Sequence, residues 1–210
     1  MSPKKVHAFF SRLAAANPEP KGELEFATPY QLLVAVVLSA QATDKSVNRA
    51  TRQLFRDHPT PQAIAALGES GIANYIQSIG LYNTKARNVA ALSRLLLEHH
   101  GGEVPHDRTA LEALPGVGRK TASVVLNIAF KEATIAVDTH IFRVGNRTGL
   151  APGKTVEAVE QQLLKAVPAE FRLHAHHWLI LHGRYTCKAR APDCAHCLVH
   201  DLCAYMVKNV

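Results

Sequence analysis

The sequence contains no segment that is long and apolar enough to cross a bilayer. Its longest largely apolar run covers residues 32–40, whereas a transmembrane helix needs about 20 such residues. The first five residues, Met-Ser-Pro-Lys-Lys, lead into a mixed amphipathic stretch rather than the apolar centre of a signal peptide. We therefore expect a cytoplasmic protein without a membrane partner.

Cysteine is absent from the first 186 residues, and all four cysteines fall between positions 187 and 203. They therefore belong to one local site and do not form disulfides that link distant parts of the chain. In the cytoplasm we expect them to be reduced or bound to a metal. Internal repeats and low-complexity tracts are also absent. The only strand-like run, residues 133–137, is short and has no evident pairing partner.

The chain is basic. It has 24 Lys and Arg against 17 Asp and Glu, a formal net charge of +7 over 210 residues. Such an excess suits a polyanionic partner such as nucleic acid, although a basic protein without any such partner has the same composition. With 47% hydrophobic residues, the chain can form one core or two small domains.

Helix patterns occupy almost the whole sequence and predict an all-α fold. Thr28 is placed to cap a helix that begins at Pro29. Residues 83–100 carry apolar side chains at helical spacing, and Gly101 follows them. Further helices are expected at 44–58, 62–67, 69–78, 107–114, 119–130, 138–147, 156–167 and 171–185.

Two interruptions divide the chain. Prolines and a glycine break residues 18–22, and the polar pair at 131–132 separates two apolar segments. We expect residues 22–132 to form one helical domain. Residues 1–21 and 133–210 are expected to form the other.

Residues 114–122, Leu-Pro-Gly-Val-Gly-Arg-Lys-Thr-Ala, join two expected helices. Gly116 and Gly118 allow unusual backbone angles and leave room for a close neighbour. The second helix presents free N–H groups at its N-terminus, where the helix dipole attracts an anion, and Arg119 adds positive charge there. Residues 107–130 are therefore predicted to form a helix-hairpin-helix that grips one DNA phosphate. The alternative is a plain tight turn between helices.

Two residues have the chemistry of a catalytic pair. Lys120 lies in the first turn of its helix, where the dipole and Arg119 both favour the neutral, nucleophilic amine; its alternative role is a phosphate contact. Asp138 begins another expected helix, whose N–H groups keep its carboxylate ionised and able to accept a proton or stabilise a cationic sugar. Its alternative role is a simple N-cap.

The four cysteines, Cys187, Cys194, Cys197 and Cys203, can close around one metal centre. Structural zinc sites more often use two Cys-x2-Cys pairs, and only one is present here. From the residues alone, iron–sulfur and zinc both remain open.

The motif at 114–122, followed by Val-Asp-Thr-His-Ile-Phe-Arg at 137–143, resembles that of helix-hairpin-helix DNA glycosylases with a catalytic Asp. With lysine at position 120, the motif resembles that of the endonuclease III branch. The resemblance runs from Thr28 to Cys203. It implies two helical domains flanking a DNA-binding cleft, one barrel-like with the hairpin and one with a structural [4Fe–4S] cluster on the four cysteines.

The resemblance also implies an activity. Lys120 attacks C1′ of the sugar and expels an oxidised pyrimidine, with Asp138 as the catalytic carboxylate. The resulting Schiff base undergoes β-elimination, which nicks the strand 3′ to the abasic site. The implied partner is damaged double-stranded DNA, bound by a monomer.

A buried base must be rotated out of the duplex before it can react. By resemblance, Gln41 fills the vacated stack, and Leu81 and Ile79 press on the opposite strand. From the residues alone, Gln41 is an ordinary polar loop residue and Leu81 an ordinary core residue.

Further contacts are expected around these residues. Lys188 and Arg190, between the first two cysteines, are expected to meet DNA phosphates. Asp44 and His140 are expected to line the pocket for the flipped base, with capping or supporting roles as the alternative.

Two other functions compete with this one. A related enzyme that removes adenine from mismatches shares the hairpin, Asp and cluster, but lacks the Lys and usually has an added C-terminal domain; Lys120 and the end at Val210 favour the lyase. The second competing function is that of a non-catalytic DNA-binding protein with a structural metal. Covalent trapping on abasic DNA with borohydride separates all three.

Overall fold

Every regular element in the computed structural model is helical, as the sequence predicts. The structure describes residues 1–206, and no strand occurs among them. The strand-like run at 133–137 forms no strand, although Ile135, Ala136 and Val137 are buried. Because these three side chains are buried, the segment has the apolar composition that is typical of a strand, although it pairs with none.

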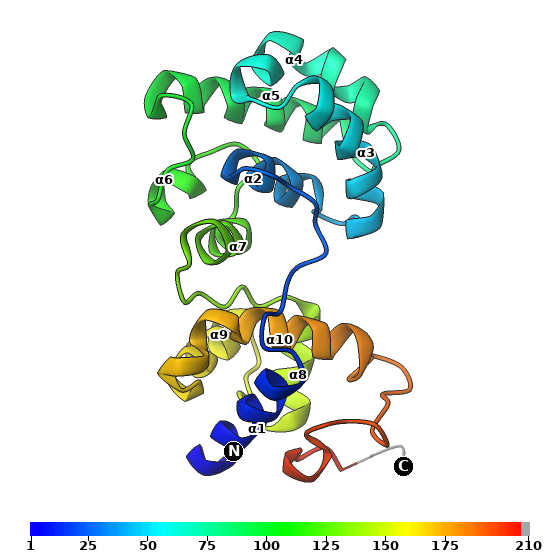
Figure 1. Cartoon of the computed structure of the whole chain (residues 1–210), viewed down its shortest axis with the longest axis vertical. Helices are drawn as coiled ribbons and strands as arrows, with labels where there is room; N and C mark the ends of the chain where they lie inside the picture. The colour runs from blue at the N-terminus through cyan, green and yellow to red at the C-terminus, as the bar shows by residue number, and fades with distance from the viewer. Residues whose placement is uncertain (207–210) are drawn as a thin grey trace. The chain divides into compact units, whose positions relative to one another are not determined.

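The chain separates into two compact units. Glu23–Lys131 form one, here called the middle unit. Met1–Gly22 and the described residues from Glu132 onward form the other, here called the terminal unit. The terminal unit is therefore built from both ends of the chain (Figure 1).

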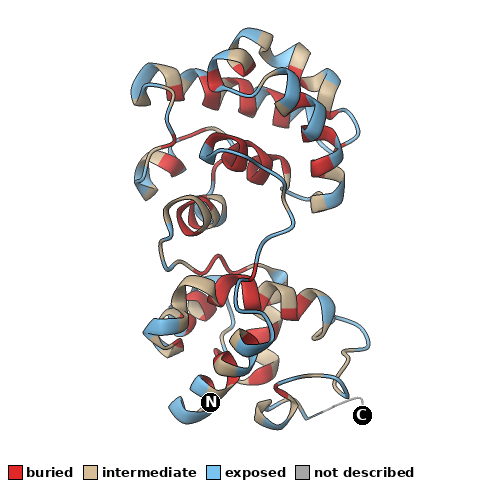
Figure 2. Ribbon diagram, in the orientation of Figure 1, coloured by how far each residue is buried: buried red, intermediate tan, exposed pale blue. Residues whose placement is uncertain are grey.

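The middle unit contains six helices among the described residues. They are α2 (Pro29–Leu38), α3 (Asp44–Asp57), α4 (Pro61–Ile76), α5 (Tyr82–His100), α6 (Arg108–Glu112) and α7 (Arg119–Phe130). Helix α2 is its centre, since every residue of α2 after Pro29 is buried (Figure 2). It packs against α7, and α4 packs along α5.

Local capping explains where these helices begin. Thr28 accepts a hydrogen bond from the Gln31 N–H at 3.2 Å, and Pro29 occupies the first helical position. The predicted start of α2 is therefore confirmed. Thr60 caps α4 in the same way, through the Ala63 N–H at 3.3 Å.

Helix α4 consists of two helical segments that meet at a kink, so the two helices expected at 62–67 and 69–78 are confirmed. The kink lies at Gly68, whose φ of 71° and ψ of 174° are not helical. Glycine permits this conformation without the steric cost of a side chain.

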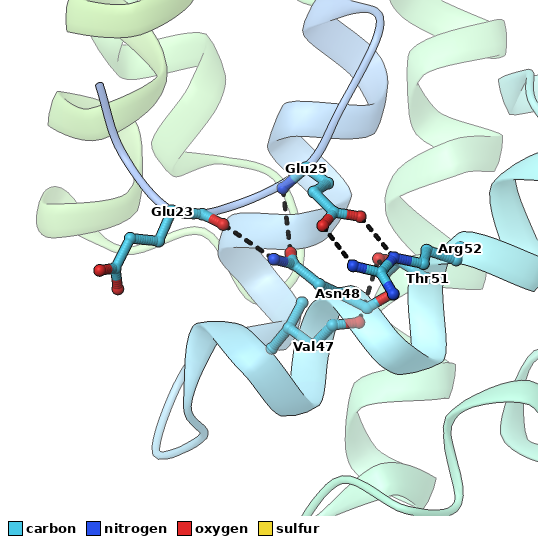
Figure 3. Close-up of polar contacts among 6 residues, drawn as sticks. All are labelled: Glu23, Glu25, Val47, Asn48, Thr51 and Arg52. Atoms are coloured by element: carbon cyan, nitrogen blue, oxygen red, sulfur yellow. Dashed lines mark hydrogen bonds and ion pairs between the residues drawn. The ribbon is translucent and has the colours of Figure 1, made fainter. Parts of the chain in front are cut away.

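The segment before α2 is tied to α3 by polar contacts (Figure 3). Asn48 Oδ1 accepts from the Glu25 N–H at 2.9 Å, and Asn48 Nδ2 donates to the Glu23 carbonyl at 2.8 Å. Arg52 adds a two-pronged ion pair with the Glu25 carboxylate, at 2.6 and 2.5 Å. These contacts fix the chain where it enters the middle unit.

The terminal unit contains four α-helices and two short 3-10 turns among its described residues. They are α1 (Pro3–Ala16), α8 (Thr139–Thr148), α9 (Val156–Ala166), η1 (Ala169–Phe171), α10 (Arg172–Tyr185) and η2 (His200–Leu202). Phe9 and Phe10 of α1 are fully buried, and Phe10 lies against Trp178 of α10. The Trp178 indole donates to the Asn17 carbonyl at 2.8 Å, which locks the N-terminal helix in place.

Gly183 marks the closest approach between α10 and α8, and it provides a test of the packing. A Cβ there would lie 2.8 Å from the His140 Cβ and 3.1 Å from the His140 carbonyl oxygen. We expect Gly183→Ala to destabilise the fold by about 1–3 kcal/mol through overpacking. Urea unfolding should measure this loss. As control, Gly80→Ala has open space around its new methyl group and should change stability by less than about 0.5 kcal/mol; equal stability of the two variants would contradict the packing.

Candidate functional site

The hairpin between α6 and α7 is held by its apolar residues. Asp107 caps α6 through the Ala110 N–H at 2.8 Å. Leu111, Leu114 and Val117 are buried in the core of the middle unit. The hairpin is therefore rigidly seated before any ligand binds.

The spacing of apolar residues predicts that Val124, Val125 and Ile128 of α7 pack against these three residues of the hairpin, and of them only Val125 is fully buried. Ala122, Val125 and Leu126 are the buried apolar positions of this helix, whereas Val124 and Ile128 are only half-buried. The expectation took the right helix but a face rotated by part of a turn, because spacing alone does not fix which stripe meets the core.

Gly116 is the position where glycine is required. Its φ is +80°, and a Cβ would lie 3.0 Å from Asn88 Nδ2 on α5 and 3.1 Å from Val37 Cγ1 on α2. Gly118 has φ −96°, which other residues also adopt, and a Cβ there meets nothing within 4 Å. Gly118 instead keeps the space in front of the α7 N-terminus open, where an anion is favoured.

Arg119 and Lys120 are both exposed in the first turn of α7. The amine of Lys120 therefore stands at the rim of the anion-attracting helix end, with solvent access. An exposed amine beside a bound phosphate is suitably placed to reach the adjoining sugar.

Two loops of the middle unit carry left-handed residues that are not glycine. Gln41 has φ 55° and Leu81 has φ 60°, and both side chains are exposed. Leu81 is 63% exposed, which is unusual for a leucine. Non-glycine residues in this region carry backbone strain, which concentrates at functional sites.

Ile79 does not belong with them. It is 2% exposed and packs in the core of the middle unit. Its side chain is therefore not exposed in this structure, and its expected contact with the opposite DNA strand stays a prediction. Leu81, two residues later, takes the exposed position.

The expected pocket residues both begin helices. Asp44 is the first residue of α3, after the N-cap Thr43, and is half-buried. His140 lies in the first turn of α8, and its Nδ1 is 3.2 Å from Arg143 Nη2. These are the positions of helix-end and supporting residues, and a pocket role for either stays a prediction.

Asp138 is the N-cap of α8. Its Oδ1 accepts from the His140 and Ile141 N–H groups, each at 2.9 Å. The residue is half-buried. Two N–H donors on one oxygen fix the orientation of the group, which leaves Oδ2 for a further partner. Asp138 lies in the terminal unit and Lys120 in the middle unit.

The four cysteines line one cavity in the terminal unit. Arg147, His182, His200 and Tyr205 also line it. Burial raises the pKa of the Cys197 thiol, a backbone hydrogen bond near Val199 lowers it, and the three other cysteines raise it further. Burial also lowers the pKa of His182 to about 4, so its ring is neutral at pH 7.

Several N–H groups approach the sulfur atoms. The Tyr205 N–H lies 3.4 Å from Cys203 Sγ, and His182 Nε2 lies 3.9 Å from Cys197 Sγ. Arg147 Nη1 lies 3.9 Å from Cys187 Sγ. Such donors stabilise thiolates that bind a metal centre. The thiol-lined cavity therefore fits a metal centre chemically.

Within residues 1–206, no group of three or more His, Cys, Asp or Glu side chains is arranged to hold one metal ion. A zinc site needs its sulfurs about 2.3 Å from one ion. In a [4Fe–4S] cluster each thiolate meets a different iron, so the sulfurs surround a larger object.

Two arginines that the sequence reasoning missed hold the loop after Cys187. Arg143 donates to the carbonyls of Cys187 at 2.9 Å and Gly183 at 2.7 Å. Arg147 donates to those of Lys188 at 2.6 Å and Ala189 at 2.9 Å. Their spacing of four residues on α8, which places both on one face, was the available signal.

The same loop presents its own cations outward. Lys188 and Arg190 are exposed, and Ala191 has φ 46°. Their backbone is therefore fixed from the inside while the side chains face solvent. This arrangement suits contacts with an extended anion.

No described helix has the length and apolar character needed to span a membrane.

Comparisons with known proteins agree with these features. The family model described as HhH-GPD superfamily base excision DNA repair protein matches residues 34–169. Endonuclease III of Escherichia coli strain K12 is 61% identical over 208 residues, 99% of each chain. Endonuclease III of Haemophilus influenzae is 58% identical over the same length, again 99% of each.

Solved structures match as well. A trapped endonuclease III–DNA covalent intermediate superimposes with a TM-score of 0.90 and 42% identity, over 97% of this chain and 96% of that one. A thermostable thymine-DNA glycosylase gives 0.84 and 27% identity, over 96% of each. The chain belongs to the HhH-GPD superfamily of base excision DNA repair proteins.

Proposed function

We propose that this protein removes oxidised pyrimidines from duplex DNA and nicks the strand at the resulting abasic site, with Lys120 as nucleophile and Asp138 as catalytic carboxylate. The broader activity follows from the family and its endonuclease III relatives: the chain is a DNA glycosylase with AP lyase activity in base excision repair. The observation that carries the finer proposal is the exposed Lys120 directly after the phosphate-gripping hairpin.

The chemistry assigned to Lys120 is covalent. Its neutral amine forms a bond to C1′ as the C1′–base bond breaks, and the departing base takes a proton. The ring opens to a Schiff base, loss of a C2′ proton follows, and the 3′ phosphate leaves. Water then releases the sugar fragment and regenerates the amine. A lysine in the first turn of α7 suits this role because its exposed amine stands beside the helix end that binds the phosphate.

Asp138 supports this chemistry from the end of α8. Its carboxylate accepts the proton that Lys120 must lose, or stabilises the cationic sugar as the base departs. The two N–H bonds to Oδ1 support this role because they hold the group in a fixed orientation.

DNA is held by groups of both units. Gly116, Gly118 and Arg119 bind one phosphate, and Lys188 and Arg190 bind others. In the middle unit, Gln41 fills the space left by the flipped base and Leu81 presses on the opposite strand. Their exposure and left-handed backbone support these roles.

The base pocket and the working form of the protein complete the proposal. Asp44 and His140 contact the flipped base. The protein acts as a monomer on DNA in the cytoplasm, at the nucleoid.

A [4Fe–4S] cluster on Cys187, Cys194, Cys197 and Cys203 has a structural role in this proposal. When bound, it supplies four metal–thiolate bonds that order the tail, and it leaves no open iron for substrate. The cavity that the four cysteines share and the N–H groups near their sulfur atoms support a metal centre bound by these residues.

Removing the amine of Lys120 should abolish covalent trapping. We expect Lys120→Ala to give no borohydride-trapped complex on abasic duplex, while binding to damaged DNA largely survives. Lys120→Arg is the matched control, because it keeps the charge yet cannot form the Schiff base, and it should also fail to trap. Trapping of either variant at the wild-type level would disprove the assignment.

Salt dependence tests the loop after Cys187. Binding should weaken with salt at a log–log slope of about −0.9 per neutralised phosphate. Replacing both Lys188 and Arg190 with Ala should flatten the slope by up to about two units. Lys4 and Lys5 are exposed on α1, so their double replacement is a control with the same charge change. If the slope stays unchanged in the Lys188 and Arg190 variant, the loop does not touch DNA.

Metal content tests the cluster. Purified protein should be yellow-brown and contain about four irons and four sulfides. Cys197→Ser should disorder the tail and weaken DNA binding, because few apolar side chains there offset the entropy of ordering. Lys120 and Asp138 lie outside the tail, so some activity should remain at high protein concentration. A colourless protein with one tightly bound zinc would refute the cluster but not the glycosylase.

A further inference from the structure

Lys85 is a buried cation without a partner. The residue is 5% exposed, and its Nζ has no hydrogen-bond acceptor among residues 1–206. Burial lowers the pKa of its amine. Burying an ammonium without a partner opposes folding, and an apolar side chain of similar length would avoid that cost. The lysine is therefore not explained by the stability of the unit.

Its place on α5 is informative. The Lys85 N–H donates to the carbonyl of Leu81, the exposed left-handed residue that begins this helix, at 3.0 Å. Leu81, Lys85 and Asn88 follow the i, i+4, i+7 spacing of one helix face.

The far end of this face reaches the hairpin. Asn88 Nδ2 lies 3.0 Å from where a Cβ of Gly116 would stand. Leu81 and Asn88 are separated by about 10 Å along the helix axis. Lys85 thus lies between the exposed Leu81 and the glycine that shapes the phosphate-binding turn.

We infer that Lys85 is a further DNA-binding residue, whose ammonium bonds to a backbone phosphate of the DNA between the Leu81 loop and the hairpin. This inference rests on the proposed function, since it needs DNA across this face of the middle unit. A phosphate oxygen supplies both the hydrogen-bond acceptor and the negative charge that Lys85 lacks. The flexible four-carbon stem lets the ammonium move to the surface while its methylene groups stay buried.

A lysine with this role and a purely structural lysine differ in their response to substitution. Removing an unpaired buried charge relieves the folded protein, so Lys85→Met should unfold at the same or a higher urea concentration than wild type. Its affinity for a duplex with a tetrahydrofuran abasic analogue should fall severalfold. The log–log salt slope should be shallower by about 0.9, one phosphate contact.

Two variants control this experiment. Arg94 is exposed on the same helix, nine residues from Lys85 and thus about half a turn around it. Arg94→Met removes the same charge and should keep the wild-type slope. Lys85→Arg keeps the cation and should also keep the wild-type salt slope. A wild-type slope in Lys85→Met would overturn the inference.

A measurement on the wild-type protein does not depend on a variant folding. The side-chain ammonium signal of Lys85 in proton–nitrogen NMR should shift when the duplex is added, and an unshifted signal at saturation would overturn the inference. Failure of the proposed function is recognised separately, because wild-type protein would then give no borohydride trapping on abasic duplex.

Discussion

The close packing of Gly116 against α2 and α5 sets the geometry of the proposed DNA-binding end of the middle unit. Val37 lies in the last turn of α2, which leads into the Gln41 loop, and Asn88 lies on α5, which begins after Leu81. A side chain at position 116 would approach both to about 3 Å. One residue without a side chain therefore fixes the spacing of the hairpin and both loops, which contact the same stretch of DNA in the proposed function.

Several features of this end oppose stability. Gln41 and Leu81 are left-handed without being glycine, which costs on the order of 1 kcal/mol each. Leu81 also exposes most of an apolar side chain, and Lys85 buries a charge without a partner. Each feature alone has a local explanation. Together they agree with the proposal that DNA completes the contacts of this surface, since strain persists where the surroundings enforce it for function.

The sequence predicts what local chemistry determines. The Thr28 cap, the glycine at 116 and the all-α fold follow from propensities and turn requirements within a few residues. The burial of Ile79 beside the exposed Leu81 does not, because both are apolar residues of one loop and only tertiary packing decides which is buried. Likewise, nothing near Lys85 in the sequence distinguishes it from a solvated lysine. Its burial depends on neighbours that the fold supplies.

In the terminal unit, Arg147 couples the proposed metal centre to the DNA-binding loop. Its guanidinium holds the carbonyls of Lys188 and Ala189, stacks over Tyr205 at 5.0 Å and lies 3.9 Å from Cys187 Sγ. A metal-bound thiolate attracts this cation, whereas a neutral thiol binds it only weakly. In the proposed function, a charged sulfur would therefore strengthen the hold of Arg147 on the loop, in addition to the ordering of the tail by the metal–thiolate bonds.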